Sequence, residues 1–575
     1  MEQKWIVKDG FDPGVIKALS DEIKAPPIIA QILYRRGVEN KDQAQRFFRA
    51  SVKELYDPFL LQDMDKAVER LRQAVLSDQE ILIYGDYDVD GITSVTVLYL
   101  LLKELGAHVH YYIPDRHAEG YGLSESGIQT ARGKNIDLIV TVDCGITGHA
   151  EIEYAKNLGL DVVVTDHHEP GPAIPDAVAV VDPKRHDSSY PFKELAGVGV
   201  AYKLAQGLLQ RLDIDESILE RYIELVAIGT AADIVPLVDE NRIFTKEGLI
   251  RLNDSDNIGL KALIRASGLN GRNIGTGQVV FVLAPRLNAV GRMGNAERAV
   301  ELLSATDETV AQDIAKILEH ENKNRKDVDE EAFVEAIELA ESHFTNGKTN
   351  SIVLSKEGWH TGVIGIVASR VVERYYRPTV LISVEEGIGK GSARSINGFD
   401  LYDALKKCED LFIGFGGHKY AAGLTIDSEN IVKFKERLEQ IALEKLSGDD
   451  LIPALLIEQD IRLGQIDDEL VVWLKHLAPF GPKNMRPVFV SRGLQIVGTP
   501  TIVGRNHLKL KVRQDNKVLD VIAFNMGDMI YQLPSGEADL DMAFVIEENI
   551  YMGRKSIQLR AKDLRKQGEY YGQAR

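Results

Sequence analysis

Short β-rich segments alternate with amphipathic ones through much of the first half of the chain, and this alternation constrains the fold most. Apolar runs rich in β-branched residues lie at positions 81–84, 108–113, 138–142, 162–165 and 177–181. Segments with helical spacing of apolar residues separate most of these runs. Because consecutive parallel strands need a crossover, usually a helix, the pattern predicts an α/β fold with a helix-covered parallel sheet.

The remainder of the 575 residues indicates further domains, since a chain of this length exceeds one compact domain. Residues 1–75 show the spacing of short helices. Thr306–His343 contains no Pro or Gly and many alternating charges, which favours a long solvated helix. A second α/β pattern follows residue 350, and the β-rich runs beyond about Leu451 suit a small barrel.

The composition gives little information about the binding partner, but it does indicate the cellular compartment. The formal net charge of −19 argues weakly against nucleic acid, yet residues 491–575 carry 13 Lys and Arg against 10 Asp and Glu. Two cysteines, Cys144 and Cys408, cannot build a disulfide framework or a zinc ribbon. Neither a secretory signal nor a membrane span is visible, so we expect a cytoplasmic protein with no membrane contact.

The most informative motif is YGDYDVDG, which follows the first β-rich run and contains Asp86, Asp88 and Asp90. Three carboxylates within five residues repel one another unless cations lie between them. A calcium-binding hand is excluded because a strand precedes the motif and the twelfth loop position is Val97 instead of Glu. A solvated acidic turn is the alternative for this motif taken alone.

Two further strands of the predicted sheet end in similar residues. Asp143 follows one, and Asp166, His167 and His168 follow another. The carboxyl ends of neighbouring parallel strands open into one crevice, so these side chains should converge there. Carboxylates with a His suit Mn²⁺ or Mg²⁺. Adjacent histidines on an extended segment point to opposite sides, so one should ligate while the other contacts the scissile phosphate or orients the ligands.

The motifs GDYDVDG, PDRHAEGYGL, TVDCG, TDHH, LAGVGVA and GTAADIVPL occur in the order found in the DHH phosphoesterases. PRLNAVGR, WHTGVIGIVASR, GSARS and GFGGHKYAAG continue the match. Over roughly residues 45–565 the chain closely resembles the bacterial members of this family that degrade single-stranded DNA. This resemblance implies a parallel-sheet DHH domain joined by a long helix to a smaller α/β DHHA1 domain, followed by an OB-like β-barrel. The expected boundaries are 1–75 (N-terminal helical segment), 76–300 (DHH), 301–348 (long helix), 349–450 (DHHA1), 451–565 (barrel) and 566–575 (tail).

The resemblance also implies the site residues. Two divalent metal ions, Mn²⁺ or Mg²⁺, are expected, and the implied ligands are Asp86, Asp88, Asp90, Asp143, His167 and Asp233. From the residues alone Asp233 is equally a helix-capping residue. Asp143, His167 and His168 are the expected catalytic residues.

The substrate contacts implied by the resemblance fall into three groups. A pocket for the terminal phosphate is assigned to Arg116, Ser392 and Arg394, since a guanidinium can bind phosphate oxygens bidentately. The path of the strand is assigned to Arg286, Asn288 and Arg292, while His360 and His418, with Gly416 and Gly417 in the Gly-rich loop, are expected near the substrate. On the barrel, Lys509, Lys511 and Arg513 alternate and should share one strand face, where DNA contact and simple solvent exposure are both open.

The implied activity is a 5′-to-3′ exonuclease specific for single-stranded DNA, which hydrolyses phosphodiester bonds by a two-metal mechanism and releases 5′-mononucleotides in recombination and repair. A single-strand-binding protein and a helicase are expected partners of a monomeric enzyme. The alternatives are a phosphodiesterase of short oligonucleotides or cyclic dinucleotides, or a catalytically inactive DNA-binding scaffold for replication.

Overall fold

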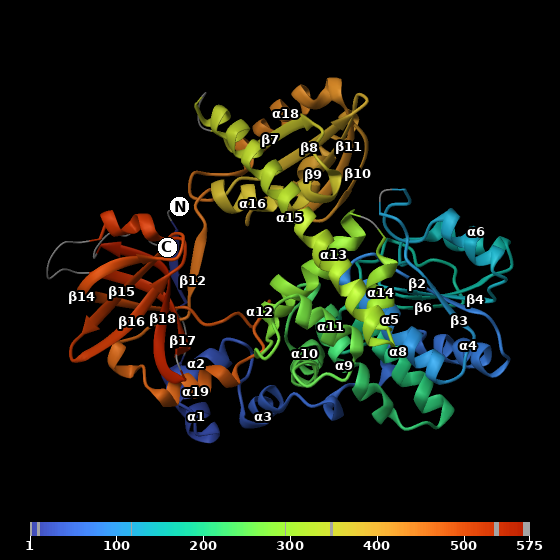
Figure 1. Cartoon of the computed structure of the whole chain (residues 1–575), viewed down its shortest axis with the longest axis horizontal. Coiled ribbons are helices and arrows are strands. Elements are labelled where there is room, and N and C mark those ends of the chain that lie inside the picture. Colours follow the sequence, from blue (N-terminus) through green and yellow to red (C-terminus); the bar gives the residue numbers. More distant parts are fainter. Residues whose placement is uncertain are drawn as a thin grey trace. The chain divides into compact units, whose positions relative to one another are not determined.

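The computed structural model describes residues 3–8, 12–116, 118–293, 295–345, 349–533, 540–551 and 553–566 (Figure 1). The chain forms two compact units. The larger unit contains Gly14–Lys323 and Lys475–Arg486, and the smaller unit contains Met1–Pro13, Asn324–Leu474 and Pro487–Arg575. Each unit is therefore assembled from segments that are distant in sequence.

A five-stranded sheet in the order β3-β2-β4-β5-β6 is the centre of the larger unit. Each neighbouring pair of its strands is parallel, which confirms the predicted parallel sheet. The strands are β2 (Ile81–Gly85), β3 (Val109–Tyr112), β4 (Leu138–Val142), β5 (Asp161–Thr165) and β6 (Ala179–Val181).

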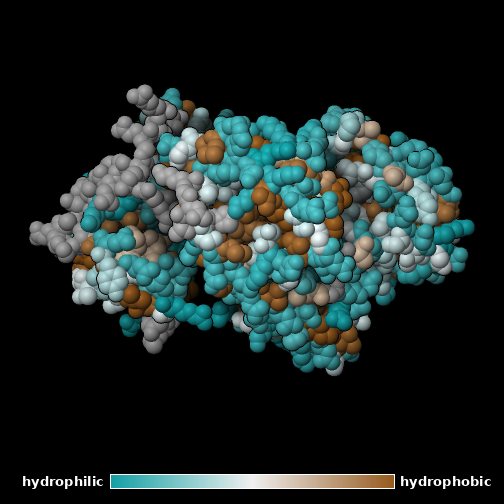
Figure 2. Space-filling model, turned by 90° about the horizontal axis from the view of Figure 1, so that it is seen from above, coloured by the Kyte–Doolittle hydropathy of each residue, from teal (hydrophilic) through white to brown (hydrophobic). Residues whose placement is uncertain are grey.

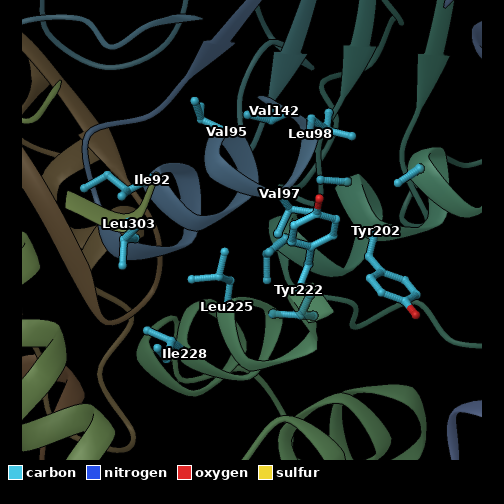
Figure 3. Close-up of a cluster of buried hydrophobic side chains, with 14 of the residues drawn as sticks. Ile92, Val95, Val97, Leu98, Val142, Tyr202, Tyr222, Leu225, Ile228 and Leu303 are labelled. Carbon is cyan, nitrogen blue, oxygen red and sulfur yellow. The ribbon is translucent and has the colours of Figure 1, made fainter. Parts of the chain in front are cut away.

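Both faces of this sheet are covered, which explains why its strands are almost continuously apolar. On β2, Ile81 and Ile83 face one hydrophobic cluster, while Leu82 and Tyr84 face another. The first cluster contains side chains of α4 (Met64–Leu76), α5 (Val89–Glu104), α8 (Gly197–Leu212) and α9 (Ile223–Ala232). The second contains side chains of α6 (Glu125–Gly133) and α7 (His149–Asn157). Figure 3 shows part of the first cluster, where α5 side chains lie among residues of α8, α9 and β4.

Further helices complete the larger unit. They are α1 (Pro13–Ile23), α2 (Pro27–Tyr34), α3 (Lys41–Arg49), α10 (Asp239–Leu252), α11 (Ile258–Ala266), α12 (Thr276–Gln278), the π-helical turn η4 (Val279–Leu283), α13 (Ala284–Met293) and α14 (Glu297–Leu303). Short 3₁₀ turns are η1 (Val52–Glu54), η2 (Pro58–Leu60) and η3 (Glu216–Tyr222). The segment Lys475–Arg486 joins this unit through Arg242, whose buried guanidinium donates to the carbonyl oxygens of Leu477, Ala478 and Pro479.

One continuous helix, α15 (Glu308–Thr345), contains the Lys323–Asn324 boundary between the two units, as the Pro- and Gly-free sequence predicts. Ala311, Ala315 and Leu318 in its first half belong to the core of the larger unit. Ala332, Ala336 and Ala340 in its second half belong to a cluster of the smaller unit. Residues 346–348, the end of the predicted connecting helix, lie outside the described residues.

A mixed sheet in the order β10-β11-β9-β8-β7 forms one part of the smaller unit. Strands β7 and β8 are parallel, and the other neighbouring pairs are antiparallel. Clusters on its two faces include α16 (Thr361–Tyr375) on one side and α17 (Leu401–Lys406) with α18 (Ile431–Lys445) on the other. The strands are β7 (Ile352–Glu357), β8 (Thr379–Glu385), β9 (Ile388–Arg394), β10 (Phe412–Gly417) and β11 (Ala421–Asp427), with 3₁₀ turns η5 (Glu409–Leu411) and η6 (Ser428–Asn430).

The remaining sheet closes into a five-stranded barrel, as expected for the C-terminal part, because β14 pairs with both β15 and β17. Its five strands are β14 (Phe489–Val503), β15 (His507–Gln514), β16 (Lys517–Ala523), β17 (Leu540–Tyr551) and β18 (Arg554–Lys566), and the short β13 (Gln459–Asp460) pairs with β14 in the same sheet. They are accompanied by η7 (Leu463–Gln465), α19 (Asp468–His476) and η8 (Gly527–Tyr531). Most of the predicted tail, residues 567–575, lies outside the described residues.

The N-terminal segment differs from the helical expectation for residues 1–75. Strand β1 (Lys4–Val7) pairs in parallel with β12 (Ala454–Ile457), so it belongs to the smaller unit. The Trp5 indole donates to a carboxylate oxygen of Asp563 at 2.7 Å, and the Arg565 guanidinium lies 4.2 Å above its ring. A strand whose partner lies so far along the chain has no local sequence signal, which is the physical reason for the difference.

On the face seen in Figure 2, hydrophobic side chains are scattered among more numerous hydrophilic ones. Within the described ranges, no helix combines the length and the apolar character that a membrane crossing requires.

Candidate metal centre

Three strands of the parallel sheet end side by side in acidic or imidazole side chains. Gly85 of β2 pairs with Val142 of β4, which in turn pairs with Thr165 of β5. The residues that follow these three strand ends, Asp86, Asp143 and the Asp166–His168 segment, therefore lie at one edge of the sheet. Their convergence at the carboxyl ends of the strands is the geometry that the sequence predicts.

The YGDYDVDG turn is folded around Asp88, the N-cap of α5. Its carboxylate accepts hydrogen bonds from the backbone N–H of Asp90 at 2.9 Å and of Gly91 at 3.2 Å. Gly91 is required because a Cβ there would lie 2.5 Å from the carbonyl oxygen of Asp86. This tight turn brings the side chains of Asp86, Asp88 and Asp90 to the same end of the strand.

Asp90 is held by the first turn of a second helix. Its two carboxylate oxygens accept from the backbone N–H of Gly197 at 2.7 Å and of Val198 at 3.0 Å. These are the first N–H groups of α8, whose own N-cap residue, Ala196, has no side chain that could accept from them. Asp90 thus satisfies orphan helix donors and is fixed in one orientation by them.

His167 is oriented so that one ring nitrogen faces the carboxylates. Its Nδ1 donates to the carbonyl oxygen of Leu195 at 3.0 Å, which leaves Nε2 without a proton. Nε2 lies 3.1 Å from Asp143 Oδ1, 3.7 Å from Asp233 Oδ2 and 3.8 Å from Asp90 Oδ2. Burial lowers the pKa of His167 to about 3, and the neighbouring His168 charge adds to this, so the ring is neutral and can ligate a metal.

His168 has a different environment from His167, although the centroids of the two rings lie only 4.5 Å apart. Its Nδ1 lies 2.8 Å from Asp166 Oδ1 and 3.0 Å from the Tyr121 hydroxyl, which itself donates to the carbonyl oxygen of Asp143. Burial would lower the pKa of His168, but the hydrogen bond to Asp166 and its charge raise it to about 9. The two adjacent histidines therefore carry one neutral and one protonated ring.

The donor set fits divalent cations. Three groups of side chains can each direct ligand atoms to a common point: Asp143, His167 and His168; Asp90, His167 and Asp233; and Asp86, Asp88 and Asp143. Three buried atoms in these groups, Asp86 Oδ1, Asp143 Oδ1 and His167 Nε2, have no hydrogen-bond partner among the described residues. Ligand atoms about 2.1 Å from an octahedral ion lie about 3 Å apart, close to the separations measured around His167.

The pKa shifts of the carboxylates also indicate a site for divalent cations. Burial raises the pKa of Asp86, Asp143 and Asp233 well above the usual range, and the neighbouring carboxylates raise it further. For Asp90, burial and the charge of Asp88 raise the pKa to about 7, although its backbone hydrogen bonds lower it. Buried carboxylates that repel one another are costly as anions unless a cation neutralises them.

Arg116 and the residues of α13 are placed differently from one another. The Arg116 guanidinium lies 5.0 Å from the Tyr87 ring centroid, and its charge lowers the pKa of Asp86, so it is near the carboxylates. The charge of Arg292 acts on the pKa of Tyr87 from the end of α13. Arg286, expected along the strand's path, is buried instead and forms an ion pair with Glu319. Asn288, also on α13, is half-buried.

In the smaller unit, two of the three residues expected at the terminal phosphate, Ser392 and Arg394, lie together on β9. The Arg394 guanidinium donates to Ser392 Oγ at 3.2 Å, and a Cβ at Gly365 of α16 would touch both side chains. His360 acts as the N-cap of α16 and accepts from the backbone N–H of Gly362.

The Gly-rich segment of the smaller unit lies beside β9 in the same sheet. Gly416 pairs with Gly423, which pairs with Ser392. A Cβ at Gly417, whose φ is +143°, would lie 2.5 Å from the Ala421 carbonyl oxygen, and the neighbouring His418 is exposed.

On the barrel, Lys509, Lys511 and Arg513 alternate with buried residues along β15 and are exposed. They therefore share one face, as the alternation predicts. Arg513 donates to Gln495 at 2.9 Å, and Lys511 lies 3.8 Å from Asp520.

Two residues of the centre were missed from the sequence. Tyr121 joins the carbonyl of Asp143 to His168, and its place within the PDRHAEGYGL motif was the available signal. Asp182 follows β6 as Asp143 follows β4, so the strand-end signal was available. Burial and the charge of Asp166 raise the pKa of Asp182 to about 8, and its Oδ2 has no hydrogen-bond partner within the described residues.

Comparisons with known proteins cover most of the chain. Residues 80–230 match the DHH family N-terminal domain, residues 348–444 the DHHA1 domain, and residues 457–563 the RecJ OB domain. The chain is 40% identical over 555 residues to the single-stranded-DNA-specific exonuclease RecJ of Bacillus subtilis, covering 96% of this chain and 70% of that protein. Crystal structures of RecJ from Thermus thermophilus in complex with Mn²⁺ and with Mg²⁺ have TM-scores of 0.85 and 0.79, at 30% and 29% identity. Each alignment covers 99% of this chain, and 80% and 79% of the respective solved chains.

A parallel sheet whose strand ends carry this Asp and His set, followed by the DHHA1 and OB domains, defines a phosphoesterase of the DHH class. Within that class, the chain belongs to the RecJ family.

Proposed function

We propose that this protein is an exonuclease specific for single-stranded DNA, which hydrolyses phosphodiester bonds with two divalent cations and proceeds from the 5′ end. The observation that supports the hydrolytic centre most directly is the set of buried, unpartnered atoms Asp86 Oδ1, Asp143 Oδ1 and His167 Nε2 at the carboxyl edge of the sheet, within the part of the chain that the structure describes. The substrate and the Mn²⁺ or Mg²⁺ dependence are supported by the relatives, which are named for that substrate and were solved with those ions.

The proposed ligands are Asp86, Asp88, Asp90, Asp143, His167 and Asp233. Two of the possible groups, Asp86–Asp88–Asp143 and Asp90–His167–Asp233, share no residue, which fits one cation each. Bound cations would activate the attacking water and stabilise the charge that develops on the phosphate oxygens. The chain itself holds the carboxylates in place through the first turns of α5 and α8.

We assign His168 to the phosphate instead of to a metal. It is protonated and its side chain is 36% exposed, so it can donate a hydrogen bond to a phosphate oxygen or to the leaving oxygen. Asp166 holds its Nδ1, and Arg116 offers a second positive charge near Asp86. These cations would bind the scissile phosphate and stabilise its transition state.

Direction and strand selectivity are proposed to come from the smaller unit. Ser392 and Arg394 share a strand, and together they offer a hydroxyl and a guanidinium to a 5′-terminal phosphate. The exposed cations of β15, Lys509, Lys511 and Arg513, would follow the backbone of a single strand.

The first test is a nuclease assay with single- and double-stranded DNA labelled at either end, with Mn²⁺, Mg²⁺ or a chelator. We expect mononucleotides to be released from the 5′ end of single strands, and only when a metal ion is present. Asp143→Ala and His167→Ala should abolish hydrolysis and preserve DNA binding, whereas Thr96→Val, which removes a buried hydroxyl that bonds only within α5, should retain both. Wild-type rates in either ligand variant would refute the assignment of the metal centre.

Polarity is tested separately. Arg394→Ala should reduce the preference for a 5′-phosphorylated over a 5′-hydroxyl end and leave the metal dependence unchanged. If the unaltered protein degraded both ends equally, the phosphate pocket would be misassigned although the metal centre could stand.

The wider setting is proposed on the family likeness. We propose a role in recombination and repair in the cytoplasm, for a monomer that works with a single-strand-binding protein and a helicase. Two buried thiols without a disulfide are compatible with a reducing compartment. The alternative activities, on short oligonucleotides or as an inactive scaffold, are not favoured, because the chain has the RecJ OB domain and the complete ligand set.

A further inference from the structure

Asn241 links two loops that each carry metal-centre residues. It lies in the first turn of α10 and is completely buried. Its amide nitrogen donates to the carbonyl oxygens of Glu194 and of Pro236, the latter at 3.1 Å. Its amide oxygen accepts from the backbone N–H of Ala196 at 3.4 Å. The side chain therefore uses both its polar atoms on backbone groups and touches no ligand.

The first of these loops, residues 194–196, orients two of the proposed ligands. The Leu195 carbonyl oxygen, between the two backbone groups that Asn241 binds, accepts from Nδ1 of His167. Immediately after Ala196, the N–H groups of Gly197 and Val198 hold Asp90. The same backbone also approaches Asp143, since a Cβ at Gly197 would lie 2.5 Å from Asp143 Oδ1.

The second loop, residues 233–236, carries another ligand. Asp233 ends α9, and the next residue, Ile234, has a φ of +62° with its side chain exposed. A β-branched residue in the left-handed region is strained and persists only where neighbouring bonds hold it. The hydrogen bond from Asn241 to Pro236 is placed two residues after the strained position and so holds the loop that carries Asp233.

We propose that Asn241 is a positioning residue that fixes the separation between Asp233 on one loop and Asp90 with His167 on the other. This inference rests on the proposed two-metal function. Groups that orient metal ligands through hydrogen bonds typically change metal affinity by about 10- to 100-fold when removed. Asn241 acts one step further out, through the backbone of both loops, and it is the affinity for the cation that it controls.

Asn253 offers a matched control at the other end of α10. Its amide also makes three hydrogen bonds to backbone groups, with Leu249 and Ile274, and it joins α10 to a loop that carries no proposed ligand. Asn241→Leu and Asn253→Leu therefore remove the same number of hydrogen bonds from the same helix. Asn253 is exposed whereas Asn241 is fully buried, so a purely structural role predicts a larger loss of stability for Asn241→Leu, but no specific loss of Mn²⁺ affinity in either variant.

The experiment is titration of the metal-free, full-length protein with Mn²⁺ by isothermal calorimetry, together with the Mn²⁺ concentration that gives half-maximal nuclease activity. We expect Asn241→Leu to weaken Mn²⁺ binding by about 10-fold or more, with much of the activity recovered at high Mn²⁺, and Asn253→Leu to bind as the unaltered protein does. If Asn241→Leu does not fold, Asn241→Ala, which leaves space for a water, replaces it. Equal Mn²⁺ affinity in the Asn241 variant and the unaltered protein, or equal weakening in both variants, would overturn the proposal. Absence of Mn²⁺ binding by the unaltered protein would instead refute the proposed function on which it rests.

Discussion

Gly197 is the position where a single added carbon should disturb the metal centre most selectively. A Cβ there would lie 2.5 Å from Asp143 Oδ1 and 2.8 Å from Asp143 Cβ and Cγ. Ordinary contacts between such atoms begin near 3.4 Å, so Asp143 or the start of α8 must move by about 0.9 Å. Asp143 directly follows the buried strand β4 and is a proposed metal ligand. The added carbon would therefore displace a carboxylate whose position catalysis requires.

The expected magnitudes follow from this shift. Misplacing a reacting group by about 1 Å costs on the order of 100-fold in rate, which is the loss of kcat/KM expected for Gly197→Ala. Overpacking should cost about 1–3 kcal/mol of unfolding free energy, partly offset by about 1 kcal/mol from the better helix propensity of alanine. The variant should therefore remain folded at room temperature with a severely reduced rate and weaker Mn²⁺ binding.

Gly199, in the same turn of α8, supplies the control. A Cβ at that position would meet the far end of the Leu195 side chain at 3.2 Å and Phe244 at 3.7 Å, and these side chains can adjust. Gly199→Ala should keep the full rate. Rates are compared on a single-stranded oligonucleotide, Mn²⁺ affinities by calorimetry and stabilities by urea unfolding. If Gly197→Ala and Gly199→Ala had the same rate and the same Mn²⁺ affinity, the close approach at Asp143 would not limit the site.

Three other predictions concern stability. Burial raises the pKa of Glu224 from 4.5 to about 7, so its contribution to stability is lost as the pH rises from about 4.5 to about 7. Glu224→Gln, which can still accept a hydrogen bond from Ser255, should therefore be about 3 kcal/mol more stable than the unaltered protein at about pH 8. At about pH 4.5 the two proteins should have similar stability, and urea unfolding at both pH values tests this. Lys203 and Glu240 form a fully buried ion pair at 2.7 Å, so Lys203→Met should cost about 3–5 kcal/mol in chemical denaturation, and a much smaller loss would contradict the stabilising role of this pair. Mn²⁺ at about 100 times its dissociation constant should stabilise the protein by about 2.7 kcal/mol, and unchanged thermal unfolding with Mn²⁺ and with chelator would contradict the repulsion among the buried carboxylates.

The parallel sheet could be predicted from the sequence because its strands are buried on both faces and so appear as apolar runs. The runs at 138–142 and 162–165 agree with β4 and β5 to within a residue. Once these strands are placed, the rule that parallel strand ends converge locates Asp86, Asp143 and His167 at one edge. The metal centre was therefore accessible from local pattern and one topological rule.

Other features depend on pairings that no local pattern contains. The ion pair of Arg286 with Glu319 joins α13 to α15. The role of Asn241 depends on two carbonyl groups contributed by separate loops, and backbone carbonyls have no signature in a sequence. Asp182 is different, since it follows a β-rich run as Asp143 does and the same rule applied to the fifth strand indicates it.

The pairing of β1 with β12 has a consequence for synthesis. Lys4–Val7 leaves the ribosome about 450 residues before Ala454–Ile457, which at about 5–20 residues per second is a delay of about 20–90 s. During that interval Lys4–Val7 lacks its β12 partner, and Lys475–Arg486, the last segment of the larger unit, is made later still. Lys4–Val7 can therefore become ordered as a strand only after the chain has been made through β12.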